Sequence, residues 1–203
     1  SIEWYQEGLC EQCGGFFGGK IKHRYICSRC ASGMNHFDRA RAASRYDGNM
    51  KKIIAAFKYE GGVWLAEDLT DVLEGCVRAH FDVARIDAVL PVPLYHARER
   101  ERKYNQSAFL AMALAKRIGR RYDAAALFRS VNTRTQTRFD ARGRRLNVGN
   151  SFVVRKPEMI FHRRILLVDD VMTTGATFDS CARALKRAGA SEVWAIACAR
   201  SDI

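Results

Sequence analysis

One stretch of the sequence decides the fold: Arg164-Ile165-Leu166-Leu167-Val168-Asp169-Asp170-Val171-Met172-Thr173-Thr174-Gly175-Ala176-Thr177. Its apolar first half predicts a buried strand, which ends in two acids and a small, hydroxylated turn. An amphipathic helix follows and stops at Gly189, and residues 192–199 predict the next strand. Ligands of open α/β sheets bind at the carboxyl ends of the strands, and this turn lies at such an end.

The residue types of this turn suit a phosphate monoester. Thr173, Thr174 and Thr177 offer hydroxyl donors, Gly175 allows the backbone to approach closely, and the first N–H groups of the helix point at whatever lies there. The two preceding carboxylates can accept hydrogen bonds from ribose hydroxyls or orient a hydrated Mg²⁺. The stretch therefore predicts a site for a ribose 5-phosphate. An ordinary strand-turn-helix corner and a different nucleotide site are the alternatives.

The rest of the chain supports an α/β fold. Apolar periodicity predicts two kinds of element, namely helices over 50–57, 63–81 and 106–118 and strands over 86–93 and 124–128. This alternation predicts a parallel sheet with helices on both faces. Residues 130–149 have almost no apolar periodicity and are rich in arginine, which predicts a mobile basic loop. Cys76 lies on the apolar face of the helix predicted over 63–81, so we expect it to be a core residue rather than a nucleophile.

Length and charge set limits on the class of protein. A chain of 203 residues with 48% hydrophobic composition can bury one α/β core and hold a small extra module. We place the module at residues 1–45 and the main domain at residues 46–203. The net charge of +12 predicts a polyanionic partner, either nucleic acid or a phosphorylated small molecule. Without a long apolar run or a secretion signal, the sequence predicts a cytoplasmic protein with no membrane span.

Four cysteines near the start of the sequence form two C-x2-C pairs. Cys10, Cys13, Cys27 and Cys30 can close a tetrahedral all-sulfur site, which suits a structural zinc ion in a zinc ribbon. Two disulfides, an iron–sulfur centre and a redox pair are the competing interpretations. The basic stretch between the pairs predicts a hairpin, which either contacts a nucleic-acid backbone or is an ordinary solvated face.

At this point the sequence resembles a known family. The acid pair and the T-T-G-x-T turn resemble the signature of type I phosphoribosyltransferases, which binds phosphoribosyl pyrophosphate (PRPP). From residue 10 to residue 200 the chain also resembles the competence-associated ComF family, which pairs a four-cysteine zinc motif with this domain. The wider match is carried by Pro91-Val92-Pro93, Arg102, Tyr104, Asn105, Gln106, Gln136, Arg144, Asn147, Val148 and Phe152. Lys103 departs from the family, which usually has glycine there, so the pyrophosphate loop is expected to differ in shape.

The resemblance implies both an activity and a set of site residues. Residues 169–177 would bind PRPP together with Mg²⁺, and the segment around Gln136, Arg142, Arg144 and Arg145 would be the flexible loop that closes over it. The catalytic residues would be Asp169, Asp170, Arg102 and Lys103, with Arg98, Arg100 and Lys58 as further cations for the departing pyrophosphate.

The family also implies partners and a role. A ComF-like protein would handle single-stranded DNA during natural transformation, together with other competence proteins. Two hypotheses follow. The protein is either an enzyme that transfers phosphoribosyl groups, or a DNA-binding protein in which PRPP at the site only regulates the binding of DNA. A metabolic phosphoribosyltransferase that acts on a nucleobase or amine is the alternative to a role in DNA uptake.

Overall fold

The computed structural model describes residues 2, 4, 8–17, 24–59, 61–94, 104–129 and 151–201. Its strands are β1 (Arg39–Arg45), β2 (Ala88–Pro91), β3 (Arg121–Tyr122), β4 (Leu127–Arg129), β5 (Phe152–Val154), β6 (Arg164–Met172) and β7 (Glu192–Arg200). Its α-helices are α1 (Ser28–Ala31), α2 (Gly48–Tyr59), α3 (Ala66–His80), α5 (Gln106–Arg117) and α7 (Ala176–Arg187). The described residues also form three 3-10 turns, η1 (Val63–Leu65), η2 (Val83–Arg85) and η3 (Pro157–Met159).

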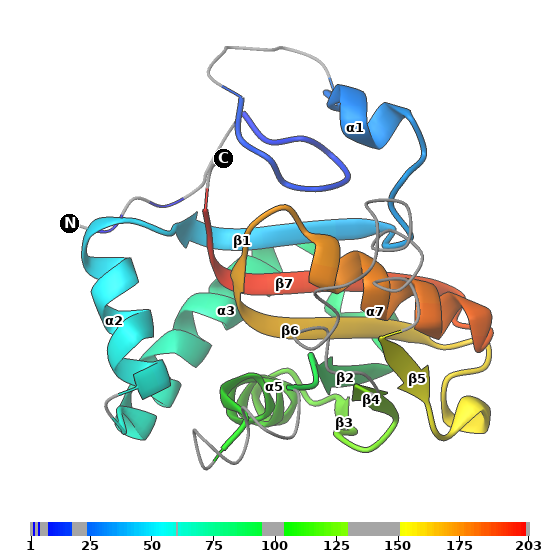
Figure 1. The fold of residues 1–203 in the computed structure, drawn as a ribbon. Helices are drawn as coiled ribbons and strands as arrows, with labels where there is room; N and C mark the ends of the chain where they lie inside the picture. The colour runs from blue at the N-terminus through cyan, green and yellow to red at the C-terminus, as the bar shows by residue number, and fades with distance from the viewer. Residues whose placement is uncertain are drawn as a thin grey trace, which may run out of the picture.

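The main sheet has five strands in the order β1-β7-β6-β2-β3, and every neighbouring pair is parallel (Figure 1). Strand β6 lies between β7 and β2, so its carboxyl end is at the centre of the sheet edge. The register pairs Val168 with Pro91 on one side and with Ile196 on the other. The predicted parallel α/β fold is confirmed.

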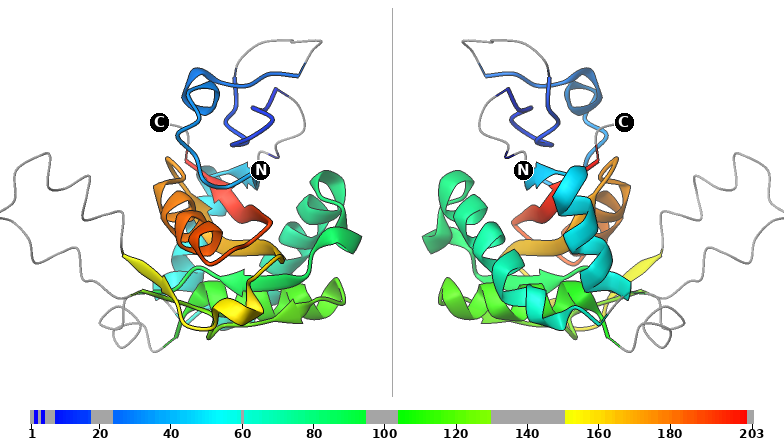
Figure 2. Two further views of the ribbon diagram at one scale, coloured as in Figure 1. Left: turned by 90° about the vertical axis from the view of Figure 1, so that its right-hand side faces the viewer. Right: turned by 90° about the vertical axis from the view of Figure 1, so that its left-hand side faces the viewer.

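Helices cover both faces of the sheet, with α7 on one side and α2, α3 and α5 on the other (Figure 2). Successive residues of a strand point to opposite faces. Accordingly Ile165 and Leu167 belong to the α7 core, whereas Leu166 and Val168 belong to the core beneath the other three helices. Each fully buried leucine contributes about 1.5–3 kcal/mol relative to an exposed one, so this alternation fixes which way β6 faces.

The predicted helices form close to their expected bounds. The inward face of α3 carries Leu69, Leu73 and Val77, all fully buried at the i, i+4, i+8 spacing. In α7 the buried positions include Phe178, Cys181 and Leu185. The residues predicted as one helix over 63–81 divide into η1 and α3, which together span nearly the same residues.

Strand β1 was not expected. It lies within the range 1–45 assigned from sequence to the cysteine module, yet it forms an edge of the main sheet by pairing with β7. The cysteine module lies beyond this edge (Figure 1). The Ala40 N–H donates to the Gln12 carbonyl over 2.7 Å, and a Cβ on Gly14 would meet the Ala40 carbonyl at 2.7 Å. Only glycine fits so close an approach.

Strands β4 and β5 pair antiparallel and flank the segment predicted as a basic loop, residues 130–149, which lies outside the described residues. The residues expected to form a hairpin between the cysteine pairs also lie partly outside them. Among the helices that the structure describes, none is both long and apolar enough to cross a bilayer.

Candidate anion and metal sites

The two acids at the end of β6 are held by partners from two different helices. The Asp169 Oδ1 accepts hydrogen bonds from the Ser107 hydroxyl at 2.7 Å and from the Asp170 N–H at 2.9 Å. The Asp170 Oδ1 forms an ion pair with the Lys58 ammonium at 2.7 Å, and both side chains are largely buried. The acid pair is therefore fixed in place before any ligand binds.

The electrostatics of the pair favour a ligand that brings positive charge or hydrogen-bond donors. Burial, together with the neighbouring charge of Asp170, raises the pKa of Asp169 to about 7, although the Ser107 hydrogen bond acts in the opposite direction. The second carboxylate oxygen of Asp170, Oδ2, is buried and has no hydrogen-bond partner among the described residues. Such an oxygen can accept a hydrogen bond from a sugar hydroxyl or from the water shell of Mg²⁺.

The turn after β6 provides the anion side of the site. Gly175 precedes α7 with φ of 80°, a left-handed conformation that favours glycine, and its Cβ would lie 2.7 Å from the Met172 Cε. The Thr174 hydroxyl accepts a hydrogen bond from the Ala176 N–H. The side chains of Thr173, Thr174 and Thr177 are exposed. Since the first N–H groups of α7 have no partner within the helix, the turn combines hydroxyl and amide donors.

The start of α5 places Ser107 beside the acids. The Asn105 side chain caps the helix by accepting from the Ser107 N–H, and its amide donates to the Val92 carbonyl at the end of β2. The Tyr104 hydroxyl donates to the Phe57 carbonyl of α2, the helix that carries Lys58. Residues 104–106, which are among those that carry the family resemblance, therefore connect β2, α2 and α5 around the acid pair.

Sequence reasoning placed some of these residues differently. Ser107 was missed, and its only signal is its position in the first turn of a capped helix. Lys58 was expected to face the departing pyrophosphate, whereas the structure pairs it with Asp170. The structure brings together residues 169–177 at one sheet edge as expected. The remaining predicted site residues lie outside the described residues: Arg98, Arg100, Arg102, Lys103, Gln136, Arg142, Arg144 and Arg145.

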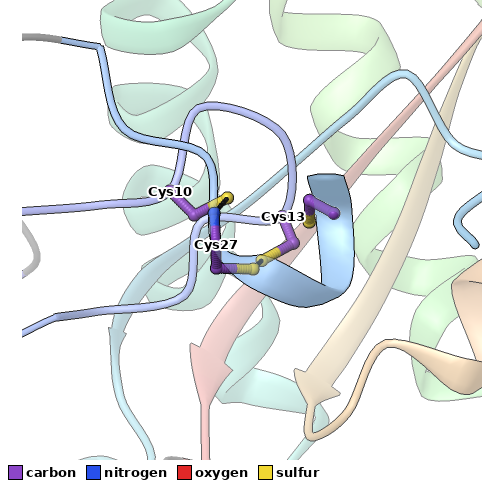
Figure 3. A group of neighbouring side chains, drawn as sticks. Cys10, Cys13 and Cys27 are labelled. Atoms are coloured by element: carbon purple, nitrogen blue, oxygen red, sulfur yellow. Dashed lines mark hydrogen bonds between the residues drawn. The ribbon is translucent and has the colours of Figure 1, made fainter. Parts of the chain in front are cut away.

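The four N-terminal cysteines form a compact cluster. Their sulfur atoms all lie within 4.8 Å of one another, and Figure 3 shows how Cys10, Cys13 and Cys27 converge beside α1. The Sγ atoms of Cys13 and Cys27 are 3.8 Å apart. Tetrahedral zinc with Zn–S bonds of 2.3 Å would separate its sulfur ligands by about 3.8 Å. The donor set and its spacing therefore fit zinc.

Backbone and side-chain donors already face the cysteine cluster. The Cys27 N–H points at the Cys10 Sγ over 3.4 Å, and the Asn35 amide points at the Cys30 Sγ over 3.2 Å. Burial raises the pKa of the Cys13 and Cys30 thiols, so in the absence of a cation these two remain protonated at neutral pH. A bound metal would reverse this and be held by the thiolates.

The cysteine module contacts the turn after β6. The Arg29 Nη1 donates to the Thr174 carbonyl over 2.7 Å, and the Arg200 Nη1 donates to the Cys13 carbonyl over 2.6 Å. The Asp179 carboxylate of α7 accepts from the His36 N–H. A small cavity of about 130 Å³ lies at this contact, lined by Cys13, Gly15, Phe16, Phe17, Tyr25, Cys27, Arg29, Asn35, Thr174 and Arg200.

The fold and the site define a class of protein, one with the type I phosphoribosyltransferase fold. The Phosphoribosyl transferase domain family matches residues 60–201, which include the acid pair, the turn and Ser107 but leave out the cysteine module, β1 and Lys58 of α2. Among solved structures, the allosteric regulatory enzyme of purine biosynthesis aligns with 65% of this chain but only 26% of its own, with 20% identity and a TM-score of 0.47.

Relatives that share nearly the whole chain narrow the class. Competence protein F of Haemophilus influenzae is 30% identical over 194 residues, which are 93% of this chain and 83% of the relative. DNA utilization protein YhgH of Escherichia coli K12 has the same identity and coverage. The chain therefore belongs to the competence protein F branch of the phosphoribosyl transferase domain family.

Proposed function

We propose that the chain binds PRPP together with Mg²⁺ at residues 169–177. The observation that carries the proposal is the juxtaposition of a fixed acid pair, Asp169 and Asp170, with a left-handed glycine turn at the start of α7. Ribose hydroxyls would face the acids, and the 5-phosphate would face the turn, where Gly175 admits a close approach. Hydrogen-bond donors for a phosphate beside hydrogen-bond acceptors for two hydroxyls suit one ligand class, a phosphorylated ribose.

Each residue would have a distinct task in phosphoribosyl transfer. Ser107 and Lys58 orient the two carboxylates, so that Asp169 and Asp170 can hold the ribose ring during displacement at its anomeric carbon. Mg²⁺, when bound, would offset the charge of the departing pyrophosphate. In the sequence-based assignment, Arg102 and Lys103 would take the same pyrophosphate, and the loop with Gln136, Arg142, Arg144 and Arg145 would exclude water.

We further propose that the protein acts in the handling of single-stranded DNA, in the cytoplasm and with other competence proteins. Support comes from the net charge of +12 and from the names of the relatives, a competence protein and DNA utilization proteins. A DNA complex held by basic side chains would lose affinity steeply as salt rises. The test is to measure the affinity for an unstructured single-stranded oligonucleotide at salt concentrations from about 50 to about 200 mM. Salt-independent or undetectable binding would contradict it.

A calorimetric titration tests the PRPP site directly. PRPP with Mg²⁺ is titrated into the zinc-loaded chain, into Asp170→Asn and into a matched control, Asp68→Asn, an exposed carboxylate at the start of α3. We expect binding by the wild type and the control, and a loss of at least tenfold in Asp170→Asn, since one hydrogen bond to a charged group contributes about 1.5–3 kcal/mol. Equal affinity in all three would show that the acids are not the site.

A second measurement separates an enzyme from a binding protein. Pyrophosphate release is followed with PRPP, Mg²⁺ and a panel of nucleobases, amines and single-stranded oligonucleotides. A metabolic phosphoribosyltransferase would release pyrophosphate with one nucleobase or amine. PRPP binding without release for any acceptor would favour the alternative in which the site only tunes DNA binding.

A further inference from the structure

One hydrogen bond joins the metal-binding module to the phosphate turn across 145 positions of sequence. Arg29 lies on α1 between Cys27 and Cys30, and its Nη1 donates to the carbonyl oxygen of Thr174 over 2.7 Å. That carbonyl belongs to the peptide unit that links Thr174 to Gly175, the residue at the start of α7. A residue of the cysteine module therefore contacts the backbone of the proposed anion site.

The hydrogen bond fixes how this peptide unit is oriented. In a trans peptide the carbonyl oxygen and the next N–H point in opposite directions, and the described residues contain no cis peptide. The Gly175 N–H therefore lies on the side away from Arg29. Glycine accepts positive and negative φ with similar ease, so the residue itself does not prevent the peptide from rotating. The bond from Arg29 selects one of the two orientations.

A second connection supports the same turn through Met172, the last residue of β6. The Arg200 guanidinium donates to the Cys13 carbonyl and lies 3.7 Å from the Met172 Sδ. Met172 in turn fills the space next to Gly175, where a Cβ would lie 2.7 Å from its Cε. The cysteine module is thus connected to the turn through the Arg29 side chain and, by way of Arg200 and Met172, through the Cys13 carbonyl.

A metal bound at the four cysteines would hold Arg29 in place. Helix α1 has four residues, far too few for an isolated helix to be stable in water. Two of the cysteine ligands, Cys27 and Cys30, bracket Arg29 and would hold this single turn through their bonds to zinc. Without the metal, the order of α1 would depend on few other contacts.

We propose that Arg29 is a positioning residue for the phosphate turn and that zinc at the four-cysteine centre sets the affinity of the turn through it. This inference deepens the proposed function and rests on it for the identity of the ligand. Zinc loss would release Arg29, let the Thr174–Gly175 peptide rotate and withdraw one amide donor from the phosphate. The centre would then have a role in ligand binding in addition to its role in folding.

The test compares two arginines of the same module. Arg29→Met removes the bond to Thr174, whereas Arg24→Met removes an equal charge from an exposed position that has no hydrogen bond or ion pair with the described residues of the turn. In the zinc-loaded full chain we expect Arg29→Met, but not Arg24→Met, to shift the ¹⁵N–¹H resonance of Gly175 and to speed its hydrogen exchange. Removing zinc from the wild type with a chelator should displace the same resonance in the same direction. Arg29→Lys, which keeps a donor, should restore part of the wild-type position.

Binding provides the second readout. We expect Arg29→Met to weaken PRPP with Mg²⁺ by about tenfold, the equivalent of one charged hydrogen bond, and Arg24→Met by less than about twofold. An unchanged Gly175 resonance in zinc-loaded Arg29→Met would overturn the proposal, as would equal effects of the two substitutions. If the wild type does not bind PRPP, the proposed function fails, but the Gly175 resonance still decides whether zinc and the turn are coupled.

Discussion

Replacing Lys58 by methionine would remove one partner of a largely buried ion pair. The side chains of Lys58 and Asp170 are 16% and 5% exposed, and their charged atoms are 2.7 Å apart. Because both exposures are low, solvent screens the pair weakly, and the loss of one partner leaves an uncompensated charge in the core. Breaking such a pair costs about 3–5 kcal/mol of unfolding free energy. For a chain of this length, we expect the melting temperature to fall by about 6–20 °C.

The assay is urea unfolding of the zinc-loaded protein at neutral pH, with Lys52→Met as the control. Lys52 lies on the exposed side of the same helix, so its loss should change the unfolding free energy by less than about 0.5 kcal/mol. The double variant Lys58→Met with Asp170→Asn leaves no orphan charge and should recover most of the loss. If Lys58→Met matched Lys52→Met, or if the double variant were as unstable as the single one, the ion pair would not hold the acid as we argue.

Three further predictions concern the same two sites. The pKa of Asp169 is raised to about 7, above that of an unfolded aspartate. The protonated Asp169 carboxyl therefore contributes fully to the unfolding free energy below about pH 4, and this contribution is lost as the pH rises through about 7. Asp169→Asn should abolish this part of the pH dependence of the unfolding free energy. Gly175→Ala should lower the unfolding free energy by about 1–2 kcal/mol through its positive φ and its contact with Met172, and PRPP titration should show weaker binding. Elemental analysis should find one zinc ion per chain in the wild type and a substantial loss in Cys13→Ser, whereas Cys76→Ser, a buried cysteine outside the cluster, should keep the metal.

The elements around β6 could be predicted because several signals agree there. An unbroken apolar run predicts a strand covered on both faces, the acid pair ends it, and a glycine with the required positive φ begins the next helix. The C-x2-C pairs were equally readable, because only cysteine supplies four thiolates at that spacing. In both cases the chemistry demands particular residue types, so the pattern in the sequence carries the information.

Strand β1 could not be predicted, because its residues carry no strand signal. Residues 39–45 consist of arginine, alanine and serine, none of which is enriched in strands. The segment becomes a strand because it pairs with β7 and because its small alanines fit beneath the cysteine module. Arg41 is buried there, and its guanidinium donates to the Cys10 and Ala40 carbonyls. Tertiary contacts decide the conformation here, and the range 1–45 assigned from sequence to the module includes the whole of this strand, which pairs in the main sheet.

The contacts that build the acid pair and the turn belong to a third category. Ser107, Lys58 and Arg29 act on groups that lie 62, 112 and 145 positions away along the chain, and sequence periodicity reports only on near neighbours. Arg29 adds a second reason, since its acceptor is a backbone carbonyl. Every residue has such an oxygen, so the identity of Thr174 reveals nothing about the arginine that contacts it. A motif can therefore locate a phosphate turn, but which distant side chain orients its peptides is decided by how the two modules pack, and only the folded chain shows this.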